Sequence, residues 1–178
     1  ITHVELDSKF LDIMKNNKII SDKNNKSLDN LKINRIIDDA YSWIKNNNHK
    51  YDFIIVDFPY PYSYDISRLY SYEFYLFIKR SLNKKGIALV DVPLFRKKYL
   101  QRYDYKNQLK HINDILYSTI MKVNFNYFKF FKINNEGFVL LSNKKLIEYY
   151  KFNFDTLKKQ DFDFEYKENN VNSIFRPK

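Results

Sequence analysis

Residues Tyr51-Asp52-Phe53-Ile54-Ile55-Val56-Asp57 form the stretch of sequence that decides the fold. A nearly continuous apolar run of this length is typical of a strand that is covered on both faces of a parallel sheet. The run predicts a buried strand over 51–58, with Asp57 at its carboxyl end. Ligands of open α/β sheets bind at the carboxyl ends of the strands, so Asp57 is expected at a binding edge.

The segments on either side of this run alternate between strand and helix patterns. Strands are predicted over 2–6, 33–37 and 87–92, with Gly86 at the turn into the last one, and helices over 8–15, 40–46, 68–82 and 108–122. The polar segment 16–30 is interpreted as a long surface connection. Strands over 123–133 and 138–142 are joined by Asn134-Asn135-Glu136-Gly137, which predicts a hairpin.

This alternation indicates an α/β fold, namely a Rossmann-like sheet of the class I methyltransferase type with a closing antiparallel hairpin. Residues 1–145 are predicted to form a partial domain of this type. Residues 146–178 are predicted to be a C-terminal extension that packs on the domain or trails from it.

The composition excludes several classes of protein. A hydrophobic content of 44% excludes a disordered chain, and no apolar run is long enough to span a membrane. The chain has no cysteine, which excludes disulfides, thiolate metal sites and a catalytic cysteine. A cytoplasmic location is compatible with this. The net charge of +10 suits a nucleic-acid or acidic-membrane partner, but the scattered lysines favour a general compositional bias.

Acids follow three of the predicted strands. Glu5 and Asp7 end the first, Asp38 and Asp39 follow the second, and Asp57 ends the third. In such sheets an acid at a strand end accepts hydrogen bonds from ribose hydroxyls, and one at the next strand can accept from an adenine amino group. Each aspartate could instead cap the helix that follows it. Both interpretations remain open, and the repetition of the pattern favours a ligand.

The loop after Asp57 is rich in proline and aromatic residues. It reads Phe58-Pro59-Tyr60-Pro61-Tyr62. Proline stiffens the backbone, and the rings could wall a pocket for an apolar or cationic group. The alternative is a rigid turn that is packed by its own rings.

Four segments in order resemble the spermidine synthases, the polyamine aminopropyltransferases. They are Val4-Glu5-Leu6-Asp7, Ile37-Asp38-Asp39-Ala40, Tyr51-Asp52-Phe53-Ile54-Ile55-Val56-Asp57 and Leu69-Tyr70-Ser71-Tyr72-Glu73-Phe74-Tyr75. The segment 171–177 also resembles the tail of a branch of this family whose members often carry a membrane-spanning half upstream. The resemblance implies that the chain starts at the second strand of the family's sheet, without the Gly-rich turn.

The resemblance also implies roles for particular residues. Glu5 would bind the ribose of decarboxylated S-adenosylmethionine or methylthioadenosine, and Asp39 with Ala40 would bind the adenine. Asp57 would be the catalytic base, and Asp57 and Tyr60 would contact the amine substrate, such as putrescine. Decarboxylated S-adenosylmethionine would be a co-substrate, with no permanently bound cofactor. A homo-oligomer is expected, and a membrane would be contacted only through an upstream segment.

Three positions depart from the family's pattern. Tyr60 stands where a second acid usually helps to hold the cationic substrate, Tyr64 where a proline is frequent, and Asp91 where a glutamine is common. Tyr60 could still offer a hydroxyl group or a cation–π face, which are weaker partners of an ammonium group than a carboxylate.

Two other functions remain open from the residues. Asp57-Phe58-Pro59-Tyr60 distantly resembles the Asp-Pro-Pro-Tyr motif of S-adenosylmethionine-dependent amino-methyltransferases, and the positive charge would suit a nucleic-acid substrate. A chain without the second acid could also be a non-catalytic nucleoside-binding or scaffold protein. The three histidines lie far apart in the sequence, and no metal site is predicted.

Overall fold

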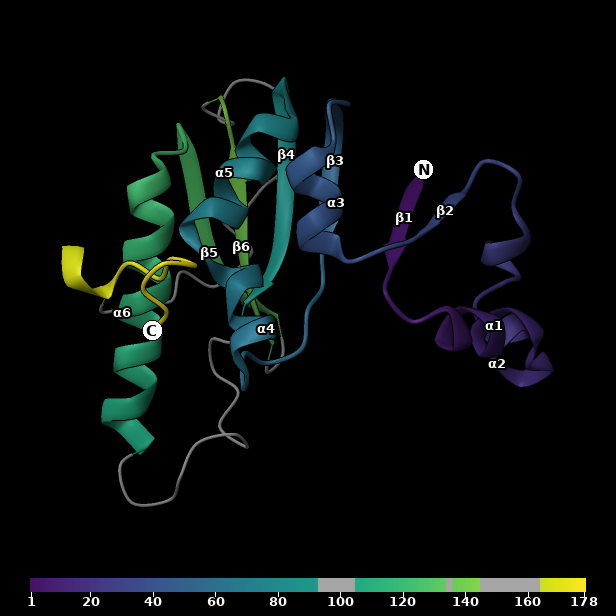
Figure 1. Cartoon of the computed structure of the whole chain (residues 1–178), viewed down its shortest axis with the longest axis horizontal. Coiled ribbons are helices and arrows are strands. Elements are labelled where there is room, and N and C mark those ends of the chain that lie inside the picture. The colour runs from purple at the N-terminus through teal and green to yellow at the C-terminus, as the bar shows by residue number, and fades with distance from the viewer. Residues whose placement is uncertain (93–104, 134–135, 145–163) are drawn as a thin grey trace. The chain divides into compact units, whose positions relative to one another are not determined.

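The computed structural model describes residues 1–92, 105–133, 136–144 and 164–178, and the chain divides into two compact units, Ile1–Asn47 and Asn48–Lys178 (Figure 1). Within the described residues, no helix is long and apolar enough to cross a membrane.

The first unit contains a two-stranded parallel sheet with its helices. Its elements are β1 (Thr2–Glu5), α1 (Ser8–Asn16), α2 (Lys18–Lys23), the 3-10 helix η1 (Ser27–Asp29), β2 (Asn34–Ile37) and α3 (Ala40–Asn46). Asp7 caps α1 by accepting hydrogen bonds from the backbone N–H groups of Lys9 and Phe10. The interpretation of 16–30 as a mere connection is wrong, because the segment contains α2 and η1. The Asn17 side chain caps α2 by accepting from Ile20 N–H at 3.2 Å, and such a cap stabilises a short polar helix.

The second unit contains a four-stranded sheet in the order β3-β4-β6-β5. Its elements are β3 (Tyr51–Val56), α4 (Tyr64–Ser67), η2 (Arg68–Tyr70), α5 (Tyr72–Ser81), β4 (Leu82–Val92), α6 (Tyr105–Val123), β5 (Tyr127–Ile133), β6 (Glu136–Ser142) and η6 (Glu168–Asn170). β3 and β4 are parallel, whereas β6 is antiparallel to both β4 and β5. The predicted closing hairpin is confirmed, with Ile133 paired to Glu136; turn residues 134–135 lie outside the described residues.

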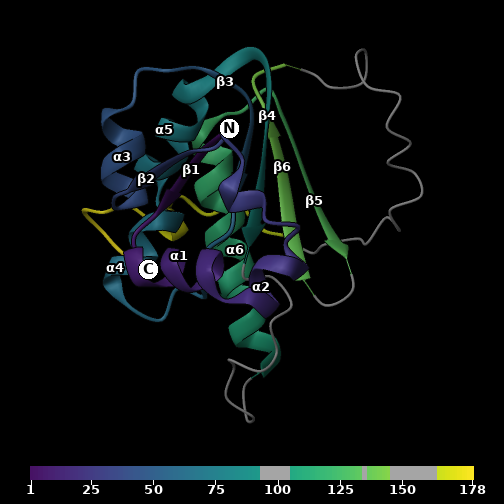
Figure 2. The same cartoon turned by 90° about the vertical axis from the view of Figure 1, so that its right-hand side faces the viewer.

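One face of the larger sheet packs against α5 and α6, which lie on the same side of it (Figure 2). The side chains on this face alternate with those on the other, as the pleat of a strand requires. The most deeply buried residues of the layer are Phe74, Tyr75, Ile78, Val90, Val92, Ile120, Val139 and Leu141. Each large aliphatic side chain buried in this way stabilises the fold by roughly 1.5–3 kcal/mol.

The other face of the sheet carries a smaller apolar cluster, centred on Phe131 and Leu140. On this face the side chains of Phe53 and Ile55 in β3 are 55% and 66% exposed. The expectation that β3 is covered on both faces is therefore wrong for this structure. An apolar run specifies a strand, but it does not reveal which neighbour covers each face.

Gly86 lies inside β4 rather than at a turn before it. The pairing of β3 with β4 shifts register between Tyr51 and Phe53, so Gly86 sits at an irregularity in the ladder. A Cβ atom at this position would lie 2.7 Å from the carbonyl oxygen of Tyr51. The strand can follow this path because glycine has no side chain to clash there.

The described part of the C-terminal segment, residues 164–178, runs beside α6. The Phe164 ring stacks on the Tyr117 ring of α6 at a centroid distance of 5.2 Å, and it contacts the Phe130 ring of β5 at 4.8 Å. Residues 146–163 of the predicted extension lie outside the described residues.

Candidate active site

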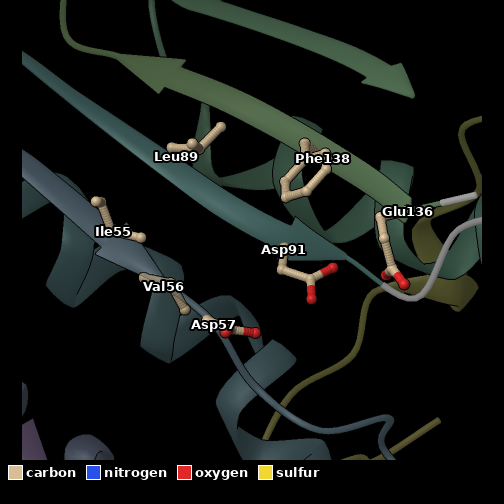
Figure 3. Close-up of a pocket in the computed structure, with 7 residues that line it drawn as sticks. All are labelled: Ile55, Val56, Asp57, Leu89, Asp91, Glu136 and Phe138. Atoms are coloured by element: carbon tan, nitrogen blue, oxygen red, sulfur yellow. The ribbon is translucent and has the colours of Figure 1, made fainter. Parts of the chain in front are cut away.

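Asp57 lines a pocket at the carboxyl ends of β3 and β4. The pocket has a volume of about 400 Å3. It is lined by Ile55, Val56, Asp57, Leu89, Asp91, Glu136 and Phe138. Figure 3 shows the three acidic side chains gathered at one end, with the apolar side chains of Ile55, Leu89 and Phe138 beyond them.

The register of the strands explains why these acids meet. Val56 is paired with Val90, so Asp57 and Asp91 each follow a buried valine and project to the opposite face. Asp91 is paired with Phe138 in β6. Glu136 stands two residues before Phe138, and side chains two apart on a strand share a face.

The three acids differ in exposure. Asp91 is only 8% exposed, whereas Asp57 and Glu136 are exposed. Among the described residues, the carboxylate of Asp57 makes no hydrogen bond or ion pair, so it is available to a ligand. Among the described residues that line the pocket, none is a lysine or an arginine, although the chain as a whole carries a net charge of +10. Carboxylates that converge in a partly apolar cleft are groups with which a cation such as an ammonium ion can pair.

The backbone that follows Asp57 is fixed by the side chain of Tyr70. The Tyr70 hydroxyl group donates to the carbonyl oxygen of Pro59 at 3.0 Å, and it also lies 3.3 Å from that of Phe58. The Phe58 ring packs edge-on against Phe74, with centroids 5.5 Å apart. Asp57 is therefore followed by an anchored loop, which is the property required of a residue that must hold a defined position.

Tyr60 does not line the Asp57 pocket. Together with Tyr70, His111 and Asn172, it lines a second cavity of about 200 Å3. Burial raises the pKa of the Tyr60 hydroxyl group above its usual value. Asp57 and Tyr60, to which the family resemblance assigns contact with the amine substrate, thus line two different cavities.

The predicted nucleoside residues Glu5, Asp39 and Ala40 lie in the first unit, at one edge of its sheet. Glu5 is paired with Ile37, so the ends of β1 and β2 meet beside Asp39. Asp39 caps α3 by accepting from Ser42 N–H at 2.8 Å, and Glu5 accepts from Asp7 N–H at 2.9 Å. The helix-capping interpretation of Asp39 is therefore confirmed. One carboxylate can serve both as a cap and as a ligand acceptor, because it offers two oxygen atoms.

Asp91 and Glu136 are the site residues that sequence reasoning missed. In the sequence, Asp91 stands out only as a departure from the family's pattern, and the residues around Glu136 predict a turn. They lie close to Asp57 only because β3, β4 and β6, which are distant in sequence, pair side by side. Within the described ranges, no three His, Cys, Asp or Glu side chains form a group that could hold a metal ion.

Comparisons with known proteins agree with this architecture. A spermidine synthase solved in complex with the transition-state analogue AdoDATO superposes with a TM-score of 0.63, at 17% identity over 96% of this chain and 55% of that chain. Human methyltransferase-like protein 13 in complex with SAH superposes with a TM-score of 0.54, at 15% identity over 81% of this chain and 61% of that one. The fold is that of a class I methyltransferase-type α/β protein, as predicted.

The sequence match is more specific. The family model of the spermine/spermidine synthase domain matches residues 1–152. The polyamine aminopropyltransferase of Leptospira interrogans is 30% identical over 97 residues, which are 53% of this chain and 20% of that protein. The chain belongs to the spermine/spermidine synthase family. It spans only about a fifth of the length of this relative.

Proposed function

We propose that this chain carries the acid-lined amine site of a polyamine aminopropyltransferase. The reaction would transfer an aminopropyl group from decarboxylated S-adenosylmethionine to an amine such as putrescine. The observation that supports this best is the exposed Asp57 carboxylate, which shares one pocket with Asp91 and with apolar walls. An alkyl diamine has the matching chemistry, since it carries ammonium groups on a methylene chain.

In this mechanism Asp57 acts as the general base. An alkylamine has a pKa of about 10.4 and therefore binds as an ammonium ion. The carboxylate of Asp57 accepts its proton, and the nitrogen lone pair then attacks the methylene carbon next to the sulfonium. A C–N bond forms and the C–S bond breaks, so that sulfur keeps the electron pair and methylthioadenosine leaves. Alignment of the nitrogen, carbon and sulfur atoms supplies much of the remaining acceleration.

The other acids would hold the substrates. Asp91 and Glu136 would bind the ammonium groups, which offsets the lack of an acid at Tyr60. The family resemblance assigns the ribose to Glu5 and the adenine to Asp39 and Ala40, and the meeting of β1 and β2 at their carboxyl ends is compatible with that role.

The test is aminopropyl transfer by the full-length protein, with decarboxylated S-adenosylmethionine and putrescine as substrates. Chromatography is expected to detect spermidine and methylthioadenosine in equal amounts. Asp57→Asn removes the base and is expected to lower kcat by a factor on the order of 10²–10⁴. The Kd for methylthioadenosine, measured by calorimetry, should stay within about threefold, because the nucleoside does not depend on this carboxylate.

Asp52→Asn is the matched control, because Asp52 lies at the other end of β3 and accepts a hydrogen bond from the Asn83 side chain at 2.6 Å. An asparagine there keeps an acceptor oxygen, so the variant should retain its activity. Full activity of Asp57→Asn would remove Asp57 from the role of base. A full-length protein that transfers no aminopropyl group to any diamine would refute the proposed function.

A further inference from the structure

The C-terminal segment crosses from α6 to the turn between α4 and α5, more than a hundred residues earlier in the chain. Asn172 is the most deeply buried residue of its described part and is only 4% exposed. Its backbone N–H donates to the Thr119 hydroxyl of α6 at 2.9 Å, and its carbonyl oxygen accepts from Tyr72 N–H of α5 at 2.8 Å. Its side-chain amide donates to the carbonyl oxygen of Ser67, the last residue of α4, at 3.0 Å.

The next two residues of the segment bind the first turn of α5. The Ser173 hydroxyl group donates to Glu73 Oε1 at 2.5 Å, and Ile174 N–H donates to Glu73 Oε2 at 3.1 Å. The Tyr64 hydroxyl group in α4 donates to the carbonyl oxygen of Ile174 at 3.1 Å. Hydrogen bonds to a carboxylate are roughly twice as strong as neutral ones, so Glu73 is a firm point of attachment.

The turn that receives these bonds also holds the loop after Asp57. η2 lies between Ser67 and Tyr72, and it ends with the buried Tyr70. The Tyr70 hydroxyl group donates to the loop carbonyl oxygen of Pro59 and lies close to that of Phe58, as described above. The bonds of Asn172 to the residues on either side of η2 therefore limit the movement of Tyr70.

We propose that residues 171–174 are a positioning strap for the Asp57 loop, with Asn172 as its principal positioning residue. The strap fixes η2, η2 fixes Tyr70, and Tyr70 fixes the backbone at Phe58 and Pro59. Its kinetic consequence rests on the proposed function, because the strap would then set the place of the catalytic base. Its structural consequence, an ordered loop, does not depend on that function.

The kinetic test compares Asn172→Ala and Tyr70→Phe in the full-length protein. Each is expected to lower kcat roughly tenfold, because a small displacement of a catalytic group is costly, while the KM for the nucleoside substrate changes less than twofold. The double variant should lose much less than the product of the two effects, because both residues act through the same loop. Independent, multiplicative effects would overturn the proposed chain of contacts.

Lys122→Gln is the matched control for loss of a contact between α6 and the C-terminal segment. Lys122 pairs with Glu168 at 2.8 Å, and both side chains are well exposed. This pair does not reach η2, so its loss should leave kcat unchanged within about twofold. Asn172→Asp keeps the size of the side chain but replaces the amide donor, which faces the carbonyl of Ser67. It is expected to be as impaired as Asn172→Ala.

Hydrogen exchange separates failure of the strap from failure of the proposed function. In the loop, Phe58, Tyr60 and Tyr62 carry amide hydrogens, whereas Pro59 and Pro61 do not. Mass spectrometry of a peptide that covers 57–63 should show at least tenfold faster exchange in Asn172→Ala and Tyr70→Phe than in the wild type or Lys122→Gln. Unchanged exchange in Asn172→Ala would overturn the strap, whether or not the protein transfers aminopropyl groups.

Discussion

A substitution of Asp91 tests whether this chain binds its amine substrate differently from the family's usual pattern. It is nearly buried and lines the same pocket as Asp57, whereas Tyr60 lines a different cavity. Asp91→Asn should raise the KM for putrescine about tenfold, because a charge-assisted hydrogen bond to the ammonium group becomes a neutral one and each tenfold change corresponds to about 1.4 kcal/mol. Steady-state kinetics at saturating nucleoside measures this effect.

Tyr60→Phe provides the comparison, because it removes only a hydroxyl group from the second cavity. We expect the KM for putrescine to change less than twofold in this variant. A large increase with Tyr60→Phe and none with Asp91→Asn would return the role of amine binding to Tyr60.

The residues of the site were only partly predictable from sequence. Asp57 could be found because a strand and its terminal acid are adjacent in the chain. Asp91 and Glu136 could not, because the side to which a strand residue points matters only once the register with its neighbours is known. Glu136 in particular belongs to β6, although its neighbours suggested a turn.

At the scale of elements, a substitution of Gly86 tests the close pairing of β4 with β3 at Tyr51. Gly86→Ala should lower the free energy of unfolding by roughly 1–3 kcal/mol, because the added methyl group meets backbone atoms that cannot move aside easily. Thermal unfolding monitored by circular dichroism measures the loss. Lys84→Ala on the same strand is the control, since Lys84 is exposed and its loss should cost less than about 0.5 kcal/mol. Equal stability of both variants would contradict the close approach of Gly86 to Tyr51.

The predicted elements were most accurate where local pattern and local capping agree. The helix over 40–46 matches α3 at both ends, and Asp39 supplies its cap. The polar α2 was missed because its sequence lacks an apolar stripe. α4 was also missed, since prolines precede it closely, although Ser63 caps it by accepting from Ile66 N–H at 3.4 Å.

At the scale of the whole molecule, the two units differ in how much core they bury. Leu11, Tyr41 and Ile44 are the buried hydrophobic side chains of the first unit, whereas β4, β6, α5 and α6 contribute most of the buried residues of the second. Local stability follows buried apolar contacts. Amide hydrogens of β1 and β2 are therefore expected to exchange at least tenfold faster than those of β4 and β6. Mass spectrometry of peptides from the four strands measures this, and equal protection would contradict the ranking.

The strap also has a consequence for the order of events during synthesis. Asn172 follows Ser67 by 105 residues, and a ribosome needs roughly 5–20 seconds to add them. Early in that interval the Asp57 loop and Tyr70 have both been synthesised, but the segment that holds η2 has not been made. A nascent chain, or one released early, can therefore contain β3 and β4 and still lack the contacts that hold η2 and the Asp57 loop in place. On the proposed function, competence for catalysis would thus arise late, when translation has passed residue 174.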